Sequence, residues 1–467
     1  MKNVSSNKRY SPHKASQLSQ PIYRYRYTRW YLRLIAFGLD WLGNFLMAIV
    51  RYRSTARTTW DEPKKVLIVQ FDHLGDAVLT TGMFPLLRAR YPHARIDLLV
   101  AEWNQEPFHN NPYVNTIHIS RHNWLNRRIS CRMFLGEALR LGLEMQRHQY
   151  DLAIDVRGDV LVAFLLWMAR IPRRLGWGVG GGSFLYTDCP TWIAQRPEIE
   201  TRRALLEPLG IQREASVLPQ LFPTEQQKKR VTDLLYSEKG TKNTSEGTHE
   251  LNRLPGKRRA RSGNEKAVTT IVLHVSAGTE AKRWRISHQR ELVRQICRRG
   301  DLQVVLVGGR SDCAVGRRIS AGFSISHVRD LTGKLTVLEL AALMKKAQLF
   351  IGGDSGPAHI AGWADIPTVV LFSGTNRMEQ WRPPGKRVQV VHEPVTCMPC
   401  HQKFCPFSDH PCMERITPEK IYHLANNILG RPVFEKDVVD SEDLAIARNV
   451  RLKQVQPAVT QSARLLR

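Results

Sequence analysis

The chain has 467 residues, of which 69 are lysine or arginine and 42 are aspartate or glutamate, so its formal net charge is +27; 42% of the residues are hydrophobic. These values exclude a disordered, collagen-like or coiled-coil chain and allow about two or three domains with cores of their own. Eight unevenly spaced cysteines exclude a secreted disulfide framework, and the polar, basic first 30 residues predict no cleavable signal peptide. We therefore expect a reducing compartment and, because of the positive charge, anionic partners.

Residues 1–60 predict a basic N-terminal extension, because they contain eleven lysines and arginines and one acidic residue. Residues 32–50 within it are largely apolar and predict a helix. Its few polar neighbours fall on one narrow stripe of that helix: Arg33, Asp40, Asn44 and Arg51. Tyrosine, tryptophan and arginine in the flanks suit a lipid headgroup layer, so we expect this helix to lie on an anionic membrane surface. The alternatives are a full membrane span, or packing on its own domain or on another subunit.

Short apolar runs alternate with helical segments from Pro63 onward. This alternation predicts that residues 61–222 form a Rossmann-like, doubly wound α/β domain. Strands are expected at 66–71, 96–100, 116–119 and 151–155, and helices near 77–90, 131–148 and 159–170.

A polar, basic stretch at residues 223–267 interrupts the alternation and predicts a flexible linker or insertion, because it cannot bury a core. Residues 268–435 predict a second Rossmann-like domain, and residues 436–467 a tail. Two such domains in series should face a central cleft, because ligands bind beyond the carboxyl ends of parallel strands. In the second domain, strands are expected at 268–275, 303–308, 348–352 and 367–372, and helices near 287–299, 336–346 and 357–364.

The first strand of the first domain leads into a candidate catalytic turn. Gly75 allows a tight turn, and Asp76 lies at the start of the following helix, where a side chain projects into the cleft. The alternative role of Asp76 is an N-cap. Asp72 is expected to be a satisfied turn residue.

The second domain contains a glycine-rich turn, GGDSG, at residues 352–356, just before Pro357 opens a helix. Backbone N–H groups and the helix dipole at such a place can bind a diphosphate, although an ordinary turn is the alternative. Lys282 and Arg283, in another loop that follows a strand, could neutralise that phosphate, and residues 276–279 could add backbone donors. Solvated surface charge is the alternative for the two basic residues.

Four cysteines lie close together near the end of the second domain: Cys397, Cys400, Cys405 and Cys412. Their spacing is compatible with a structural zinc ion held tetrahedrally, and reduced or redox-linked thiols are the alternative. A catalytic role is not expected, since no arrangement of cysteine, histidine and asparagine accompanies them.

The order of the motifs HLGD, RARYP, DLAIDVRGD, RRLGW, AKRW and GGDSGPAHIAG resembles that of glycosyltransferase family 9, the bacterial lipopolysaccharide heptosyltransferases and their relatives. The resemblance covers roughly residues 64–430. It implies the GT-B fold, in which two Rossmann-like doubly wound parallel-sheet domains face a central cleft. It also implies inversion at the sugar carbon, no metal requirement, and ADP-L-glycero-D-manno-heptose as the usual donor. The chain departs from the family pattern at residues 81–83 and at residues 372–375, near the expected donor pocket.

The resemblance also implies roles for individual residues. The family's catalytic aspartate falls on Asp76, as the general base for the acceptor hydroxyl, and its phosphate-contacting lysine falls on Lys282. The complete set of expected donor-binding residues is Ser276, Thr279, Lys282, Asp354, Ser355, Gly356 and His359.

The resulting prediction is transfer of a heptose or related sugar from an ADP-sugar to the lipopolysaccharide core or a related saccharide-lipid. No cofactor is expected beyond the possible zinc, and the enzyme should be peripheral on the inner face of the cytoplasmic membrane. A nucleotide-sugar epimerase of GT-B fold is one alternative, although it would need no membrane-prone helix. A basic nucleic-acid-binding protein whose four clustered cysteines hold zinc is the other, although the sequence has no recognition element, so no nucleic acid is expected as a partner.

Overall fold

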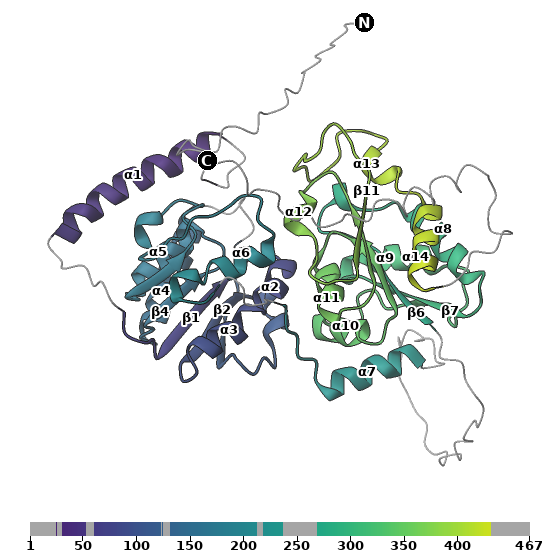
Figure 1. Cartoon of the computed structure of the whole chain (residues 1–467), viewed down its shortest axis with the longest axis horizontal. Coiled ribbons are helices and arrows are strands. Elements are labelled where there is room, and N and C mark those ends of the chain that lie inside the picture. Colours follow the sequence, from purple (N-terminus) through teal and green to yellow (C-terminus); the bar gives the residue numbers. More distant parts are fainter. Residues whose placement is uncertain are drawn as a thin grey trace, which may run out of the picture.

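The computed structural model describes residues 25, 30–52, 60–122, 124, 131–212, 218–236 and 269–430. Within these residues, two α/β domains lie side by side along the long axis of the molecule (Figure 1). The expected tail at residues 436–467 lies outside the described residues.

Among the described residues, the N-terminal domain contains a parallel sheet with the strand order β3-β2-β1-β4-β5. Alternate residues of β1 enter the cores on opposite faces, which explains its continuous apolar sequence. One face packs against α2, α3 and α6, and the other against α4 and α5. The strands are β1 (Lys65–Gln70), β2 (Arg95–Ala101), β3 (Thr116–Ser120), β4 (Leu152–Asp155) and β5 (Arg173–Gly176). The helices are α2 (Leu74–Thr80), α3 (Met83–Arg90), α4 (Cys131–Gln146), α5 (Val160–Met168) and α6 (Glu198–Ala204).

The C-terminal domain repeats this plan with the parallel order β11-β10-β9-β6-β7-β8. Helices α10 and α11 cover one face of the sheet, and α8, α9 and α14 cover the other. The strands are β6 (Thr269–His274), β7 (Leu302–Val307), β8 (Val328–Asp330), β9 (Leu349–Gly353), β10 (Thr368–Phe372) and β11 (Val388–His392). The helices are α8 (Ile286–Cys297), α9 (Cys313–Ser320), α10 (Val337–Met344), α11 (Gly356–Ala364), α12 (Met378–Trp381), α13 (Pro411–Glu414) and α14 (Pro418–Ile428).

Each strand that the sequence pattern predicts is confirmed within one residue at both ends, and the three strands that it misses have the same location in their sheets. β5, β8 and β11 all lie at an edge of their sheet. An edge strand has a neighbour on one side only and tolerates polar residues, so its apolar signal is weaker. The helix expected at 77–90 is two helices, α2 and α3, interrupted at Thr81 and Gly82.

The prediction that residues 223–267 form a flexible linker is wrong for its first part. Residues 225–236 form α7 (Glu225–Tyr236), an otherwise polar helix that packs on α10. Its Val231 and Leu235 are buried in the core of the C-terminal domain, and its Arg230 forms an ion pair with Glu339. Leu234 packs against the same core, so a short apolar stripe together with this ion pair docks the helix. The rest of the expected linker lies outside the described residues.

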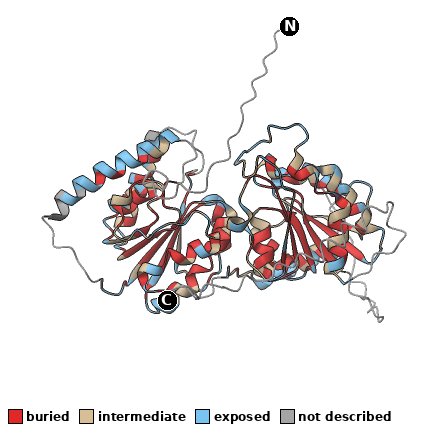
Figure 2. Ribbon diagram, turned by 45° about the horizontal axis from the view of Figure 1, so that its top comes forward, coloured by how far each residue is buried: buried red, intermediate tan, exposed pale blue. Residues whose placement is uncertain are grey.

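A further helix, α1 (Trp30–Tyr52), lies on the outside of the N-terminal domain. Figure 2 shows the strands of both sheets buried, whereas most of α1 is exposed. Of the helices in the described residues, none is long and apolar enough to cross a membrane. The alternative of a full span thus receives no support.

Candidate active site

The two domains meet where α2 packs against α11, and two glycines make this contact possible. A Cβ atom on Gly75 would lie 3.1 Å from Cδ2 of His359, and a Cβ atom on Gly356 would lie 3.2 Å from the side chain of Leu74. Such contacts are tighter than ordinary van der Waals packing. The start of α2 and the start of α11 are consequently held against each other.

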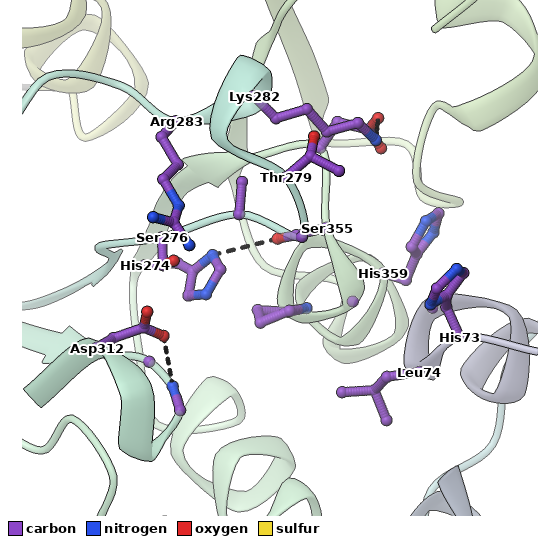
Figure 3. A pocket seen from close by; sticks show the side chains of 18 of the residues that line it. His73, Leu74, His274, Ser276, Thr279, Lys282, Arg283, Asp312, Ser355 and His359 are labelled. Atoms are coloured by element: carbon purple, nitrogen blue, oxygen red, sulfur yellow. Dashed lines mark hydrogen bonds and ion pairs between the residues drawn. The ribbon is translucent and has the colours of Figure 1, made fainter. Parts of the chain in front are cut away.

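A cavity of about 780 Å³ opens beside this contact, between the carboxyl ends of strands from the two sheets. Figure 3 shows Ser276, Thr279 and Lys282 on one side of it, and His73 and Leu74 on the side of the other domain. Every site residue expected for catalysis or donor binding lines this cavity: Asp76, Ser276, Thr279, Lys282, Asp354, Ser355, Gly356 and His359.

Asp76 contributes a buried carboxylate to the cavity from the first turn of α2. The N-cap of α2 is His73, so the alternative role of Asp76 as an N-cap is wrong. Arg202 of α6 donates a hydrogen bond to Oδ1 of Asp76 at 2.7 Å and another to Oε2 of Glu198 at 3.0 Å. Glu198 in turn accepts a hydrogen bond from Gln380 of α12, in the opposite domain, at 2.8 Å.

Arg202 is 2% exposed and holds its charge between two carboxylates. Burial lowers the pKa of its guanidinium, but the charges of Glu198 and Asp76 outweigh burial and raise the pKa above its ordinary value. The ion pairs fix the direction of the Asp76 carboxylate at the cavity wall. Arg202 is therefore a positioning residue for Asp76.

Replacing Arg202 with methionine should lower the free energy of unfolding by about 3–5 kcal/mol, because two buried carboxylates lose their cation. Urea unfolding measures this change. As a matched control, Arg294→Met removes an exposed ion pair with Glu291 and should cost less than about 1 kcal/mol. Equal losses of stability in the two variants would contradict the conclusion that Arg202 neutralises two buried carboxylates.

The C-terminal domain holds Lys282 in place through Asp354. Nζ of Lys282 lies 2.6 Å from Oδ2 of Asp354, which also accepts a hydrogen bond from Asn376 at 2.9 Å. The Lys282 side chain is 17% exposed and Asp354 is buried, so the alternative of a solvated surface lysine is wrong. The lysine thus presents a fixed positive charge at the cavity.

The beginning of α11 adds a second source of positive potential. The first turn of a helix leaves backbone N–H groups without intrahelical partners, and the helix dipole is positive there. Oγ of Ser355 lies 3.2 Å from Nδ1 of His274, at the end of β6. Burial lowers the pKa of His274 and of His359 to about 4, so both imidazoles are neutral at neutral pH. The two histidines shape the site without adding charge.

A family model described as glycosyltransferase family 9 (heptosyltransferase) matches residues 138–410. The chain belongs to glycosyltransferase family 9. It is 25% identical to lipopolysaccharide heptosyltransferase 2 of Salmonella typhimurium over 381 residues, which are 78% of this chain and 99% of that protein. It is 29% identical to lipopolysaccharide heptosyltransferase 3 of Escherichia coli over 321 residues, 66% of this chain and 82% of that protein.

Two solved structures share the fold of this glycosyltransferase. Escherichia coli ADP-heptose LPS heptosyltransferase II matches with a TM-score of 0.60 at 22% identity and covers 78% of this chain and 98% of its own. A family 9 glycosyltransferase from Veillonella parvula matches with a TM-score of 0.63 at 18% identity and covers 80% and 99%. The predicted family and the GT-B fold are confirmed, and the family favours a glycosyltransferase over the epimerase and nucleic-acid-binding alternatives.

In this family 9 enzyme, the cysteine-rich segment forms a wall of the cavity. Its Lys403 lines the cavity and accepts a backbone hydrogen bond from Ala281 at 3.1 Å, next to Lys282. The backbone N–H of Cys405 donates to Glu280 at 3.4 Å. The segment is thereby fixed to the loop that carries the cavity lysine.

All four cysteines of this segment are free thiols, and burial raises the pKa of Cys397 and Cys412. In the part of the chain that the structure describes, no three histidine, cysteine, aspartate or glutamate side chains are grouped so that they could hold a metal ion. The arrangement of Cys397, Cys400, Cys405 and Cys412 therefore gives the zinc interpretation no support.

Several residues that line the cavity or hold its side chains in place were not expected from the sequence. His274 and Asn376 follow or end predicted strands, so the rule about carboxyl ends of strands could have found them. Arg202 and Lys403 have no such local signal. Arg202 is 126 residues from its partner Asp76 in the sequence, and Lys403 reaches the cavity from a long loop.

Proposed function

We propose that this glycosyltransferase transfers a heptose from ADP-heptose to a saccharide of the lipopolysaccharide core, with inversion at the sugar carbon and without a metal ion. The observation that supports this most is the position of Asp76 from one domain and of Lys282 and the α11 start from the other around one cavity. The names of the relatives supply the sugar and the acceptor. A nucleotide sugar and a lipid-linked acceptor would meet at the inner face of the cytoplasmic membrane.

The donor would bind with its diphosphate against the C-terminal domain. Lys282 and the first turn of α11 would face the phosphate oxygens. Thr279 and Ser276 lie on the same loop as Lys282 and line the same cavity. Apolar side chains, among them Leu335, Val337 and Leu340, also line the cavity and would suit a nucleoside. The cavity lining thus includes groups for a diphosphate and groups for a base.

Transfer develops negative charge on the leaving ADP and removes a proton from the acceptor hydroxyl, and the site has a group for each of these two changes. As the bond between the sugar carbon and the phosphate oxygen breaks, negative charge grows on the departing ADP and is stabilised by Lys282 and the α11 start. As the acceptor oxygen bonds to the opposite face of that carbon, Asp76 takes its proton. The fixed lysine and helix supply the positive charge for which other enzymes use a metal, which is the basis for proposing a metal-independent reaction.

The nucleotide can be tested without knowing the acceptor, by thermal unfolding of the full chain with ADP, UDP or GDP. ADP at a hundredfold excess over its Kd should stabilise the protein by about 2.7 kcal/mol, since it binds only the folded state. UDP and GDP should give smaller shifts, and addition of EDTA should leave the ADP shift unchanged. Equal shifts with all three nucleotides would refute the proposed donor, and loss of the shift in EDTA would refute metal independence.

A further inference from the structure

Helix α1 is attached to the N-terminal domain by its polar edge. Asp40 is 1% exposed; its carboxylate accepts a hydrogen bond from the Tyr25 hydroxyl at 2.8 Å and one from the backbone N–H of Ser183 at 2.9 Å. Asp40 is the single acidic residue among residues 1–60. The only negative charge of the extension is thus turned toward the protein.

Small residues let this edge of α1 approach the domain closely. A Cβ atom on Gly43 would lie 2.3 Å from the ring of Phe184, and a Cβ atom on Gly181 would lie 3.3 Å from that of Ala36. Positions 36, 40 and 43 form one narrow stripe of the helix. An amphipathic helix on a soluble domain normally buries its apolar side, so the orientation of α1 is reversed.

The outward face of α1 consists of large apolar side chains that are 36–71% exposed. Trp41 and Phe45 stack on each other there, with ring centroids 6.1 Å apart. Single exposed apolar residues are ordinary, but a continuous surface of this kind marks a contact with something apolar. We call this set the outward face: Trp30, Tyr31, Leu34, Ile35, Phe37, Leu39, Trp41, Leu42, Phe45 and Leu46.

We propose that the outward face of α1 lies in the headgroup and acyl boundary of an anionic lipid bilayer, with the helix parallel to the membrane plane. Residues 1–60 carry eleven basic residues, and their one acidic residue is turned inward, so the charge of the extension is complementary to anionic lipid. Tryptophan and tyrosine suit that boundary. At 23 residues, α1 is about 35 Å long and offers enough apolar surface for interfacial binding.

This membrane contact would lie at the same edge of the sheet as the proposed base. α1 packs on residues that follow β5, and Asp76 follows β1; β4 alone separates the two strands, so their ends are about 10 Å apart. A bilayer bound by α1 would therefore lie along the edge of the sheet at which Asp76 is found, and a lipid-linked acceptor would approach from that edge. That last step rests on the proposed function, whereas binding to lipid does not.

Flotation of the full-length protein with vesicles tests the inference. The protein should bind vesicles that contain phosphatidylglycerol more tightly than vesicles of phosphatidylcholine alone, and high salt should weaken the binding. The double variant Trp41→Ser with Phe45→Ser should lose at least tenfold in vesicle affinity. The matched control replaces two equally exposed aromatic residues of the other domain, Phe404→Ser with Phe407→Ser, and should bind vesicles as the unchanged protein does.

Other results would overturn the proposal. If sedimentation shows a dimer that the α1 variant dissociates, and no vesicle binding occurs, the outward face is an interface between two copies. Equal loss of vesicle binding in both double variants would show that the outward face of α1 is not the specific membrane contact. An assay with a soluble acceptor saccharide separates this test from the proposed function. The α1 variant should retain turnover with that acceptor. If the unchanged protein shows no turnover with it, the result counts against the proposed function alone.

Discussion

Replacing Asp76 with asparagine should lower kcat for sugar transfer by about 10³-fold, within the range that general bases contribute. Asparagine keeps the size of the side chain and can still accept the hydrogen bond from Arg202, but it cannot take a proton. Because the proposed ADP site lies on the other domain, the Kd for ADP should change by less than about tenfold, or 1.4 kcal/mol. Steady-state release of ADP measures kcat, and titration calorimetry measures the Kd.

Two neighbours of Asp76 provide the controls. Asp72→Asn makes the same chemical change in the same turn, where the aspartate pairs with Arg157 at 3.2 Å, and should retain most of the activity. His73 also lines the cavity and is the rival proton acceptor, although burial lowers its pKa. A larger loss in His73→Gln than in Asp76→Asn would transfer the role of base to the histidine.

Replacing Lys282 with alanine should have the second largest effect, lowering kcat by about 10²–10³-fold, as removal of one fixed donor to a developing anion does. ADP binding should also weaken for two reasons. The diphosphate loses a cation, and the Asp354 carboxylate, which has then lost its ion pair with Lys282, repels the phosphates. The same kinetic and calorimetric measurements apply. The expected pattern, a loss in both kcat and affinity, differs from that of Asp76→Asn.

The pair of Lys282 and Asp354 permits a stricter test. The double variant Lys282→Ala with Asp354→Asn should bind ADP more tightly than Lys282→Ala alone, since the unpaired carboxylate is gone. Arg285→Ala is the matched control, because this nearby cation is exposed and does not line the cavity, so the variant should keep its ADP affinity. Unchanged ADP affinity in Lys282→Ala would exclude a phosphate contact.

Much of the candidate site could be recognised in the sequence for a local reason. A parallel strand buried on both faces is a continuous apolar run, and the residues just after it lie at the edge where ligands bind. Asp76, Lys282 and the turn at 352–356 all follow such strands, which is why they meet in one cavity. The central strands were recognisable for the same reason, whereas three of the four edge strands in the described sheets were not.

The partners of these residues depend on contacts between distant parts of the chain. Arg202 has no motif around it and becomes important only because α6 packs beside α2. Periodicity places Asp40 on a polar stripe of α1, but its hydrogen bond from Ser183, 143 residues away, sets which side of the helix faces the domain. Local patterns record which residues share a face, because backbone geometry is periodic. Which surface that face meets is settled by packing of the whole chain, since burial and charge pairing act between segments that sequence order does not relate.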